Sequence, residues 1–186
     1  IARDFDFKYS TKQSNPDSRH PDYAGNYSST FPGDYIQTHF AWALAVEKGT
    51  GDLNNDPRIR YYLYRQRINY AARDENTMSC SVQSKPPHYT ASMPFCYTIS
   101  GYWTRDMGDG SGIPPDNQYR TTYGIYPAGG QFDANQGTSV SLNLGGNGAG
   151  IEPIWQSAFT EFVKAECALT IGTNGNPRTL LENGVR

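Results

Sequence analysis

The stretch "IEPIWQSAFTEFVKAECALTIGTNGNPRTLLENGVR", Ile151 to Arg186, carries the clearest structural pattern in the chain. Its apolar residues recur at alternating steps of four and three, which places them on one face of a helix. These residues are Ile151, Trp155, Ala158, Phe162, Ala165 and Leu169. Pro153 suits a first helical turn, and Gly172 can end a helix in the left-handed conformation. The pattern predicts a helix over about 153–171.

A second helix is expected directly after the "GTNGN" turn. Pro177 suits its first position, and the side chain of Asn176 can cap it. A helix, a tight turn and another helix form the unit of an α-hairpin or of a tetratricopeptide-like pair. We therefore expect residues 151–186 to form a helix-turn-helix.

Residues 32–70 form a second predicted helical segment. One helix is expected over Tyr35–Glu47, with Asp34 as its cap and Gly49 at its end. Another is expected to begin at Asp56 and Pro57. The residues expected to face inward are Ile36, Phe40, Trp42, Ala43, Leu44, Ile59 and Leu63, with Tyr62 as a further candidate.

Residues 71–150 are predicted to be mostly loop, with short extended pieces near 97–103, 119–126 and 139–144. Loops of this length usually carry function or rest on a scaffold. The fold class expected from these patterns is mainly α, with long irregular loops and few short strands.

The composition indicates one ordinary folded domain with much irregular backbone. Among 186 residues, 37% are apolar and 13% aromatic, and 14 Tyr, 19 Gly and 12 Pro are present. Disorder depletes aromatic residues, so this chain is expected to fold. A net charge of -2 and a pI near 5.9 provide no field that would attract nucleic acid. Nucleic acid is therefore excluded as a partner.

The three cysteines are Cys80, Cys96 and Cys167, and they are too scattered for a zinc site. Cys80 and Cys96 bracket a proline-rich loop, and both a disulfide and two free thiols remain open for them. Cys167 lies on a predicted helix and is interpreted as a small buried hydrophobic residue.

The acids Asp106 and Asp109 raise two chemical hypotheses. Glycoside hydrolysis requires two carboxyl groups held at a set separation, and Gly108 and Gly110 do not fix these two. An EF-hand loop counted from Asp106 would place Gly108 and Gly110 at ligand positions, so that motif fails. Solvated turn acids are the favoured interpretation. No cofactor is expected, although an irregular calcium site near Asp106 and Asp109 remains open.

The segment from Gly101 to Asp133 combines aromatic rings with planar polar groups. Rings can stack on the apolar faces of sugars, while acids and guanidinium groups bond to the hydroxyls. Ligand binding requires less interaction free energy from such a segment than catalysis does. The stacking candidates are Trp103, Tyr123 and Tyr126, and the polar candidates are Arg105, Asp106 and Arg120. The competing interpretation is that these rings only pack the loop onto the helices.

Five stretches of the sequence read "DPRIRYYLYRQ", "MPFC", "GYWTRDMGDGSGIPPD", "RTTYGIYPAGGQFD" and "EFVKAECALTIGTNGNPRTLLENGVR". Together they resemble the SusD/RagB family of nutrient-binding outer-membrane lipoproteins of Bacteroidetes. The resemblance implies a tetratricopeptide-like helical scaffold. It also implies that residues 1–186 are a single SusD-like region of a longer chain, with 71–150 facing the ligand.

The resemblance also implies a function. Such a protein would sit on the cell surface, anchored to the outer membrane by a lipid outside this chain. It would pass nutrient glycans to a SusC-like TonB-dependent transporter without catalysing a reaction. The alternatives are a peptide-binding family member, a module that docks a transporter, and a glycoside hydrolase that uses Asp106 and Asp109.

Overall fold

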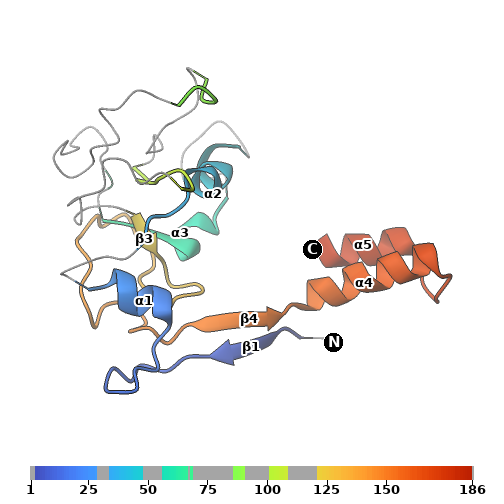
Figure 1. Ribbon diagram of the computed structural model, residues 1–186, viewed down its shortest axis with the longest axis horizontal. Coiled ribbons are helices and arrows are strands. Elements are labelled where there is room, and N and C mark those ends of the chain that lie inside the picture. Colours follow the sequence, from blue (N-terminus) through green and yellow to red (C-terminus); the bar gives the residue numbers. More distant parts are fainter. Residues whose placement is uncertain are drawn as a thin grey trace. The chain divides into compact units, whose positions relative to one another are not determined.

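The computed structural model describes residues 3–28, 34–47, 56–66, 68, 86–90, 101–108 and 121–185 (Figure 1). The chain divides into two compact units. The small unit combines residues 1–8 with 151–186, and the large unit spans 9–150. Among the described residues, no helix combines the length and the hydropathy that crossing a bilayer would require.

The expected fold class is wrong. Helices make up 33% of the described residues, and small antiparallel sheets accompany them, so this is not a mainly helical, tetratricopeptide-like scaffold. The helices of the large unit have only four to six residues each: α1 (Pro21–Asn26), α2 (Thr38–Trp42), a π-helical turn η1 (Ala43–Glu47) and α3 (Ile59–Tyr62). Most backbone N–H and C=O groups of such short helices have no hydrogen-bond partner within the helix. Buried tyrosines and bonds between loops hold this unit together instead.

The small unit contains a strand pair that the sequence patterns did not predict. Strand β1 (Phe5–Lys8) pairs antiparallel with β4 (Ile151–Trp155), with an irregularity between Phe5 and Asp6. The helix expected from Pro153 is therefore wrong in its first turn, because α4 covers Ser157–Thr170. Residues that are partnered by a strand far away in sequence leave no signal in helical periodicity.

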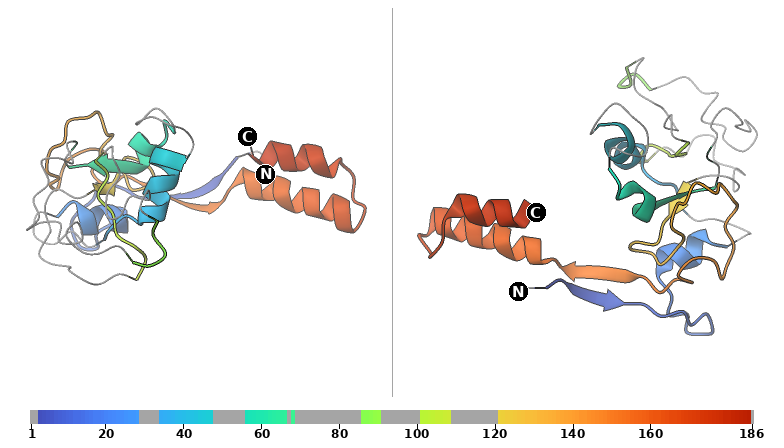
Figure 2. Two further views of the ribbon diagram at one scale, coloured as in Figure 1. Left: turned by 90° about the horizontal axis from the view of Figure 1, so that it is seen from above. Right: turned by 180° about the vertical axis from the view of Figure 1, so that it is seen from behind.

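The helical hairpin is confirmed: α5 (Pro177–Val185) follows α4 after a short turn, and the two lie side by side in both views of Figure 2. Asn176 Oδ1 accepts a hydrogen bond from Thr179 N at 3.2 Å, as a cap should. Gly172 has a φ of 68°, the left-handed conformation expected at the end of α4. Gly184 packs against the ring of Phe162, and a methyl group added there would require this ring to move.

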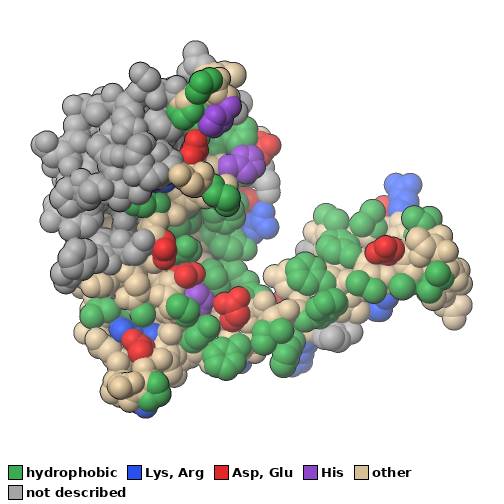
Figure 3. All heavy atoms as spheres, viewed as in Figure 1, with side chains coloured by type: hydrophobic (Ala, Val, Ile, Leu, Met, Phe, Trp, Pro, Cys, Tyr) green, Lys and Arg blue, Asp and Glu red, His purple; other side chains and the backbone are tan. Residues whose placement is uncertain are grey.

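The small unit leaves much apolar surface accessible, and Figure 3 shows it along the strand pair and the hairpin. The exposed large side chains are Phe5, Phe7, Ile154, Trp155, Phe159, Val163, Leu169, Ile171, Leu181 and Val185. Among its described residues, Ala165 is the buried apolar side chain. The small unit therefore has little core of its own.

The large unit has two apolar cores. The first contains Ile36, Ala41, Leu44, Ala45, Ile59, Leu63 and Tyr102, and the second contains Tyr23, Tyr27, Tyr64, Ala128 and Val140. Burial of Ile36, Leu44, Ile59 and Leu63 is as predicted, whereas Phe40 is 40% exposed. Tyr123 packs against both cores. Its ring therefore lies where the two cores meet.

Strand β2 (Leu63–Arg65) pairs antiparallel with β3 (Thr121–Tyr123), the one strand found within the predicted extended piece 119–126. Leu63 is opposite Tyr123 in this ladder. No strand forms over 139–144, where turns replace the expected extended piece. The piece at 97–103 lies mostly outside the described residues.

Two predicted helix starts differ from the structure. The helix expected at Tyr35 begins at Thr38, and Asp34 does not cap it. Asp34 instead bonds to the side chain of Asn26, both through its backbone N–H and through its carboxylate. The helix expected after Asp56 begins at Ile59, although Asp56 Oδ1 accepts from Arg58 N at 3.1 Å, as the carboxylate of a cap does.

Candidate functional site: an aromatic cleft beside strand β3

A cleft of about 410 Å³ opens beside β3 in the large unit. Its lining residues are Tyr35, Ile36, Gln37, Phe40, Tyr62, Leu63, Tyr123 and Pro127. They come from the residues leading into α2, from the α3–β2 junction and from β3 with the turn after it. Small-molecule sites have volumes of about 300 to 1,000 Å³ and predominantly apolar, aromatic walls. The cleft meets both criteria.

The ring of Tyr62 lines the cleft and contacts two other aromatic rings. It meets Phe40 edge to face, with 5.9 Å between ring centroids and an interplanar angle of 90°. It meets Tyr126 in the same way, at 5.2 Å and 88°. Edge-to-face contacts of this kind are a favoured arrangement of aromatic pairs and fix the orientation of the rings. Tyr126, which sequence reasoning selected, contacts Tyr62 but does not line the cleft itself.

Tyr123, another predicted site residue, lines the cleft directly and is half-buried. Burial first, and then the negative charges of Asp22 and Asp34, raise the pKa of its hydroxyl to about 12. The phenol therefore stays protonated at physiological pH. A protonated phenol can donate one hydrogen bond and accept others.

Hydrogen bonds that involve Tyr27 and Tyr62 hold the backbone at Tyr123 and Gly124 in place. The hydroxyl of Tyr27 donates to the Tyr123 carbonyl at 2.7 Å and accepts from Gln131 N at 2.7 Å. Gly124 N donates to the Tyr62 carbonyl at 2.7 Å. A side chain at Gly124 would collide with the backbone carbonyl of Tyr61, so this close approach requires glycine. The cleft is consequently built before any ligand arrives.

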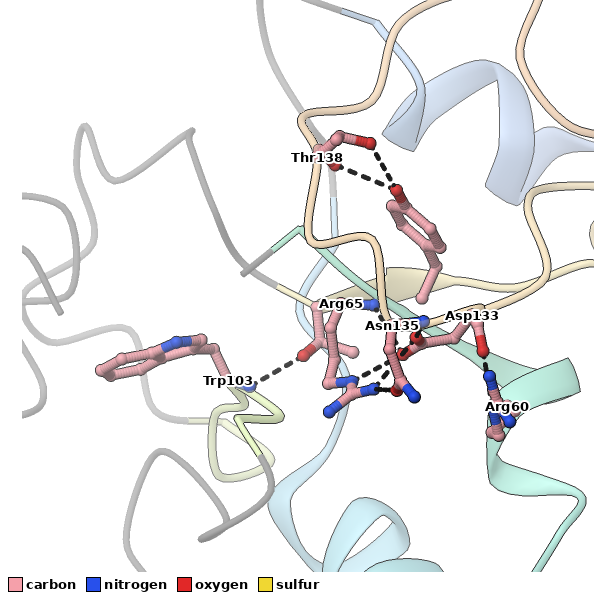
Figure 4. A network of polar contacts seen from close by, with 8 residues as sticks. Arg60, Arg65, Trp103, Asp133, Asn135 and Thr138 are labelled. Atoms are coloured by element: carbon pink, nitrogen blue, oxygen red, sulfur yellow. Dashed lines mark hydrogen bonds and ion pairs between the residues drawn. The ribbon is translucent and has the colours of Figure 1, made fainter. Parts of the chain in front are cut away.

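Trp103 and Arg105, two further predicted site residues, lie in the interior. Trp103 is 1% exposed, and its backbone N–H donates to Thr121 Oγ1 at 2.7 Å. In Figure 4 its ring points away from Arg65 and Asp133. Arg105 is 4% exposed, and its guanidinium carbon lies 5.0 Å from the centroid of the Tyr35 ring. Arg105 therefore lies against Tyr35, a residue of the cleft lining, without lining the cleft itself.

Asp106 lies next to two partners from a separate segment. The Tyr89 hydroxyl donates to its carboxylate, and His88 Nε2 lies 3.4 Å from Asp106 Oδ2. Asp109 and Arg120 lie outside the described residues, so the separation of the two acids is not defined. Within the described part of the chain, no group of three metal-ligating side chains comes together. The calcium hypothesis remains a prediction.

The cysteines are only partly described. Cys167 is a free thiol on α4 and is half-buried rather than fully buried. Cys80 and Cys96 lie outside the described residues, so their pairing remains open.

Sequence reasoning missed three residues of the cleft, namely Tyr35, Phe40 and Tyr62. Phe40 and Tyr62 were expected at inward-facing positions of helices, and Tyr35 was expected only as the start of one. The β2–β3 ladder, which pairs residues about 60 positions apart, brings Tyr62 close to Tyr123, and a separate bridge between Gln37 and Arg105 fixes the segment that holds Tyr35 and Phe40. Periodicity along one segment does not reveal such pairing.

Comparisons with known protein families, with curated proteins and with solved structures find no match to this chain. The functional argument therefore rests on the chemistry of the cleft.

Proposed function

We propose that the aromatic cleft binds an oligosaccharide. The observation that carries this proposal is the set of rings around Tyr62: Phe40 and Tyr126 meet it edge to face, and Tyr35 and Tyr123 complete the wall. Sugars present flat apolar faces rimmed by hydroxyl groups. The rings suit those faces, and the Tyr123 hydroxyl and the Gln37 amide suit the hydroxyl rim.

The energies involved are adequate for a nutrient-binding protein. Covering half of an aromatic ring of about 200 Å² contributes roughly 2 to 3 kcal/mol at about 25 cal/mol per Å². Two such contacts, less the cost of ordering the ligand, support affinities from about millimolar to micromolar. Binding at that strength allows capture and release.

The resemblance to the SusD/RagB family supports a wider role. In this proposal the protein acts at the surface of the outer membrane, to which a lipid outside this chain anchors it. It hands glycans to a SusC-like TonB-dependent transporter and performs no catalysis itself. The stacking surface belongs to the cleft of the large unit and does not depend on a helical scaffold.

A ligand footprint tests the location of the site. Backbone hydrogen exchange is compared with and without each of four neutral hexasaccharides, from the malto, cello, xylo and manno series. A ligand in the cleft should slow exchange in residues 35–42, 59–65 and 121–127. Slowing confined to the α4–α5 hairpin, or none with any sugar at saturating concentration, would contradict the proposal. Slowing of the same residues by peptides and not by sugars would favour the peptide alternative.

A further inference from the structure

Strand β1 is an edge strand of the small unit. The sheet has two strands, and β4 lies along one side of β1 (Figure 1). Among the described residues, no strand lies along its other side. Such an edge presents backbone N–H and C=O groups to which a further strand can bond.

The pairing with β4 shows which backbone groups this open edge presents. Tyr9 N donates to the Gly150 carbonyl at 2.9 Å, so the N–H of Tyr9 points toward the side of β4. Backbone groups alternate in direction along an antiparallel strand. The N–H and C=O groups of Asp6 and Lys8 therefore point away from β4. The outer edge of β4 suits a further strand less, because Pro153 has no N–H to donate.

The residues of β1 read Phe-Asp-Phe-Lys, and this sequence is complementary to itself in one antiparallel register. When two copies are centred on Phe7, Asp6 of each copy lies opposite Lys8 of the other. The two Phe7 residues then lie opposite each other. Opposite charges and aromatic pairs placed in this way stabilise a sheet.

The neighbouring registers are unfavourable. Centring the two copies on Asp6 would place two carboxylates opposite each other, and centring them on Lys8 would do the same with two ammonium groups. Like charges directly opposite each other are destabilising. The backbone also favours the register centred on Phe7, because Asp6 and Lys8 carry the groups that point outward and can exchange both hydrogen bonds of a pair.

The side chains that meet in this register are accessible. Phe7 is 54% exposed, Lys8 is exposed and Asp6 is half-buried. Neither Asp6 nor Lys8 forms an ion pair with another residue of the described part of the chain. Both charges can therefore pair with a second copy without breaking an ion pair in the first.

The small apolar area of this edge indicates weak association. Phe5 and Phe7 project from the same face of β1, and each is a little more than half exposed. With about 200 Å² for an aromatic side chain, they offer roughly 200 Å² of apolar surface per copy. Stable interfaces bury about 1,200 Å² or more in total. We therefore expect a reversible dimer.

We propose that two copies of this protein associate through antiparallel pairing of their β1 strands, with Asp6 of each copy opposite Lys8 of the other. The pair has two-fold symmetry, so each contact occurs twice. This inference is independent of the proposed function, because no residue of the cleft takes part in it.

The test is sedimentation equilibrium of the full chain from about 5 to 500 µM, at about 50 mM salt, where charge pairs are only partly screened. We expect a monomer–dimer equilibrium with a dissociation constant on the order of 10 to 100 µM. Asp6→Lys and Lys8→Asp each place like charges opposite each other at two points of the dimer. Each variant alone should associate about tenfold more weakly or less.

Two further samples test whether the two charges face each other. An equimolar mixture of Asp6→Lys and Lys8→Asp chains should recover the affinity of the wild type to within about threefold, because every pair is again of opposite charge. The double variant Asp6→Lys/Lys8→Asp should recover it as well. Lys12→Asp is the control: Lys12 is an exposed residue of the large unit, and this variant changes the net charge as Lys8→Asp does.

Three outcomes would overturn the inference. The first is a wild-type chain that stays monomeric over the whole concentration range. The second is an equal loss of association in Lys12→Asp and Lys8→Asp, which would reflect net charge rather than a defined pair. The third is weak association in the mixture and in the double variant, since misfolding or a general effect of either substitution would then explain the losses.

Discussion

In the interior of the large unit, the guanidinium of Arg65 donates two hydrogen bonds to the carboxylate of Asp133. Arg65 Nε lies 2.6 Å from Asp133 Oδ2, and Arg65 Nη2 lies 3.0 Å from Oδ1 (Figure 4). The exposed fractions of the two side chains are 4% and 0%. Asn135 accepts from the same guanidinium, and Arg60 Nε donates to the Asp133 carbonyl at 2.6 Å. The pair fixes β2, and with it Leu63 of the cleft, to the loop after β3.

Replacing Asp133 by Asn should destabilise the large unit by about 3 to 5 kcal/mol, because a buried guanidinium loses its charged partner. Urea unfolding followed by tyrosine fluorescence measures the loss. The exposed pair Arg178–Glu182 on α5 provides the control. Glu182→Gln should leave the transition unchanged, since exposed pairs contribute little. If the urea unfolding transitions of Asp133→Asn and Glu182→Gln shifted by a similar small amount, the buried pair would not be what holds the strands.

Stability should fall as the pH rises above about 10, the ordinary pKa of tyrosine. Burial raises the pKa values of Tyr27, Tyr102 and Tyr123 in the folded state, and that of Tyr123 reaches about 12. Between the two values the unfolded chain releases protons that the folded chain retains, so ionisation favours unfolding. The absorbance of tyrosinate during an alkaline titration measures this directly. In Tyr123→Phe one late-titrating group should disappear, and its persistence would refute the assignment.

Gly124→Ala should both destabilise the fold and weaken ligand binding. The added methyl group would meet the backbone of Tyr61 and Tyr62, so β3 must move away from α3. A clash of this kind typically costs about 1 to 3 kcal/mol. Gly25→Ala in α1 is the matched control, because nothing lies within 4 Å of its new methyl group. That variant should be neutral or more stable by up to about 1 kcal/mol. Equal effects would contradict the close approach at Gly124.

Asp4 should control the start of α4. Asp4 Oδ1 accepts from Ser157 N at 2.7 Å and from Ser157 Oγ at 2.8 Å, in the role that a cap usually plays. These bonds lower the pKa of Asp4. The stabilisation is therefore present above the ordinary pKa of aspartate and is lost as the pH falls through the lowered value. In Asp4→Asn, hydrogen exchange in the first turn of α4 should become faster at neutral pH. Asp6→Asn, two residues away, should leave that exchange unchanged, and a slow first turn in Asp4→Asn would contradict the role.

The part of the fold that could be predicted from sequence is the part fixed by neighbouring residues. The α4–α5 hairpin follows from local spacing, from the Asn176 cap and from Gly172. Burial of Ile59 follows from its position in a short helical pattern, whereas Leu63, expected on the same helix, is buried as the first residue of β2. Each of these features depends on side chains within about one helical turn of each other.

The errors have a common physical cause, which is pairing between distant residues. Pro153 suits a helix start by local rules, yet its segment pairs with β1 near the other end of the sequence. Asp34 suits a cap, yet the side chain of Asn26 engages it. The ring of Trp103, selected as a stacking surface, is buried in the interior instead. Tyr62, missed as a site residue, reaches the cleft because β2 and β3 meet.

The most direct test of the cleft uses two adjacent tyrosines. Tyr62 lines the cavity, whereas Tyr61 is 51% exposed, does not line it and contacts Phe132. Calorimetry measures the affinity of the tightest-binding neutral hexasaccharide for the wild type, Tyr62→Leu and Tyr61→Leu, after thermal unfolding has shown that each variant is folded. We predict a loss of about tenfold or more for Tyr62→Leu, equivalent to about 1.4 kcal/mol, and a change under about twofold for Tyr61→Leu. Equal affinities of the two variants for the sugar would contradict oligosaccharide binding in the cleft.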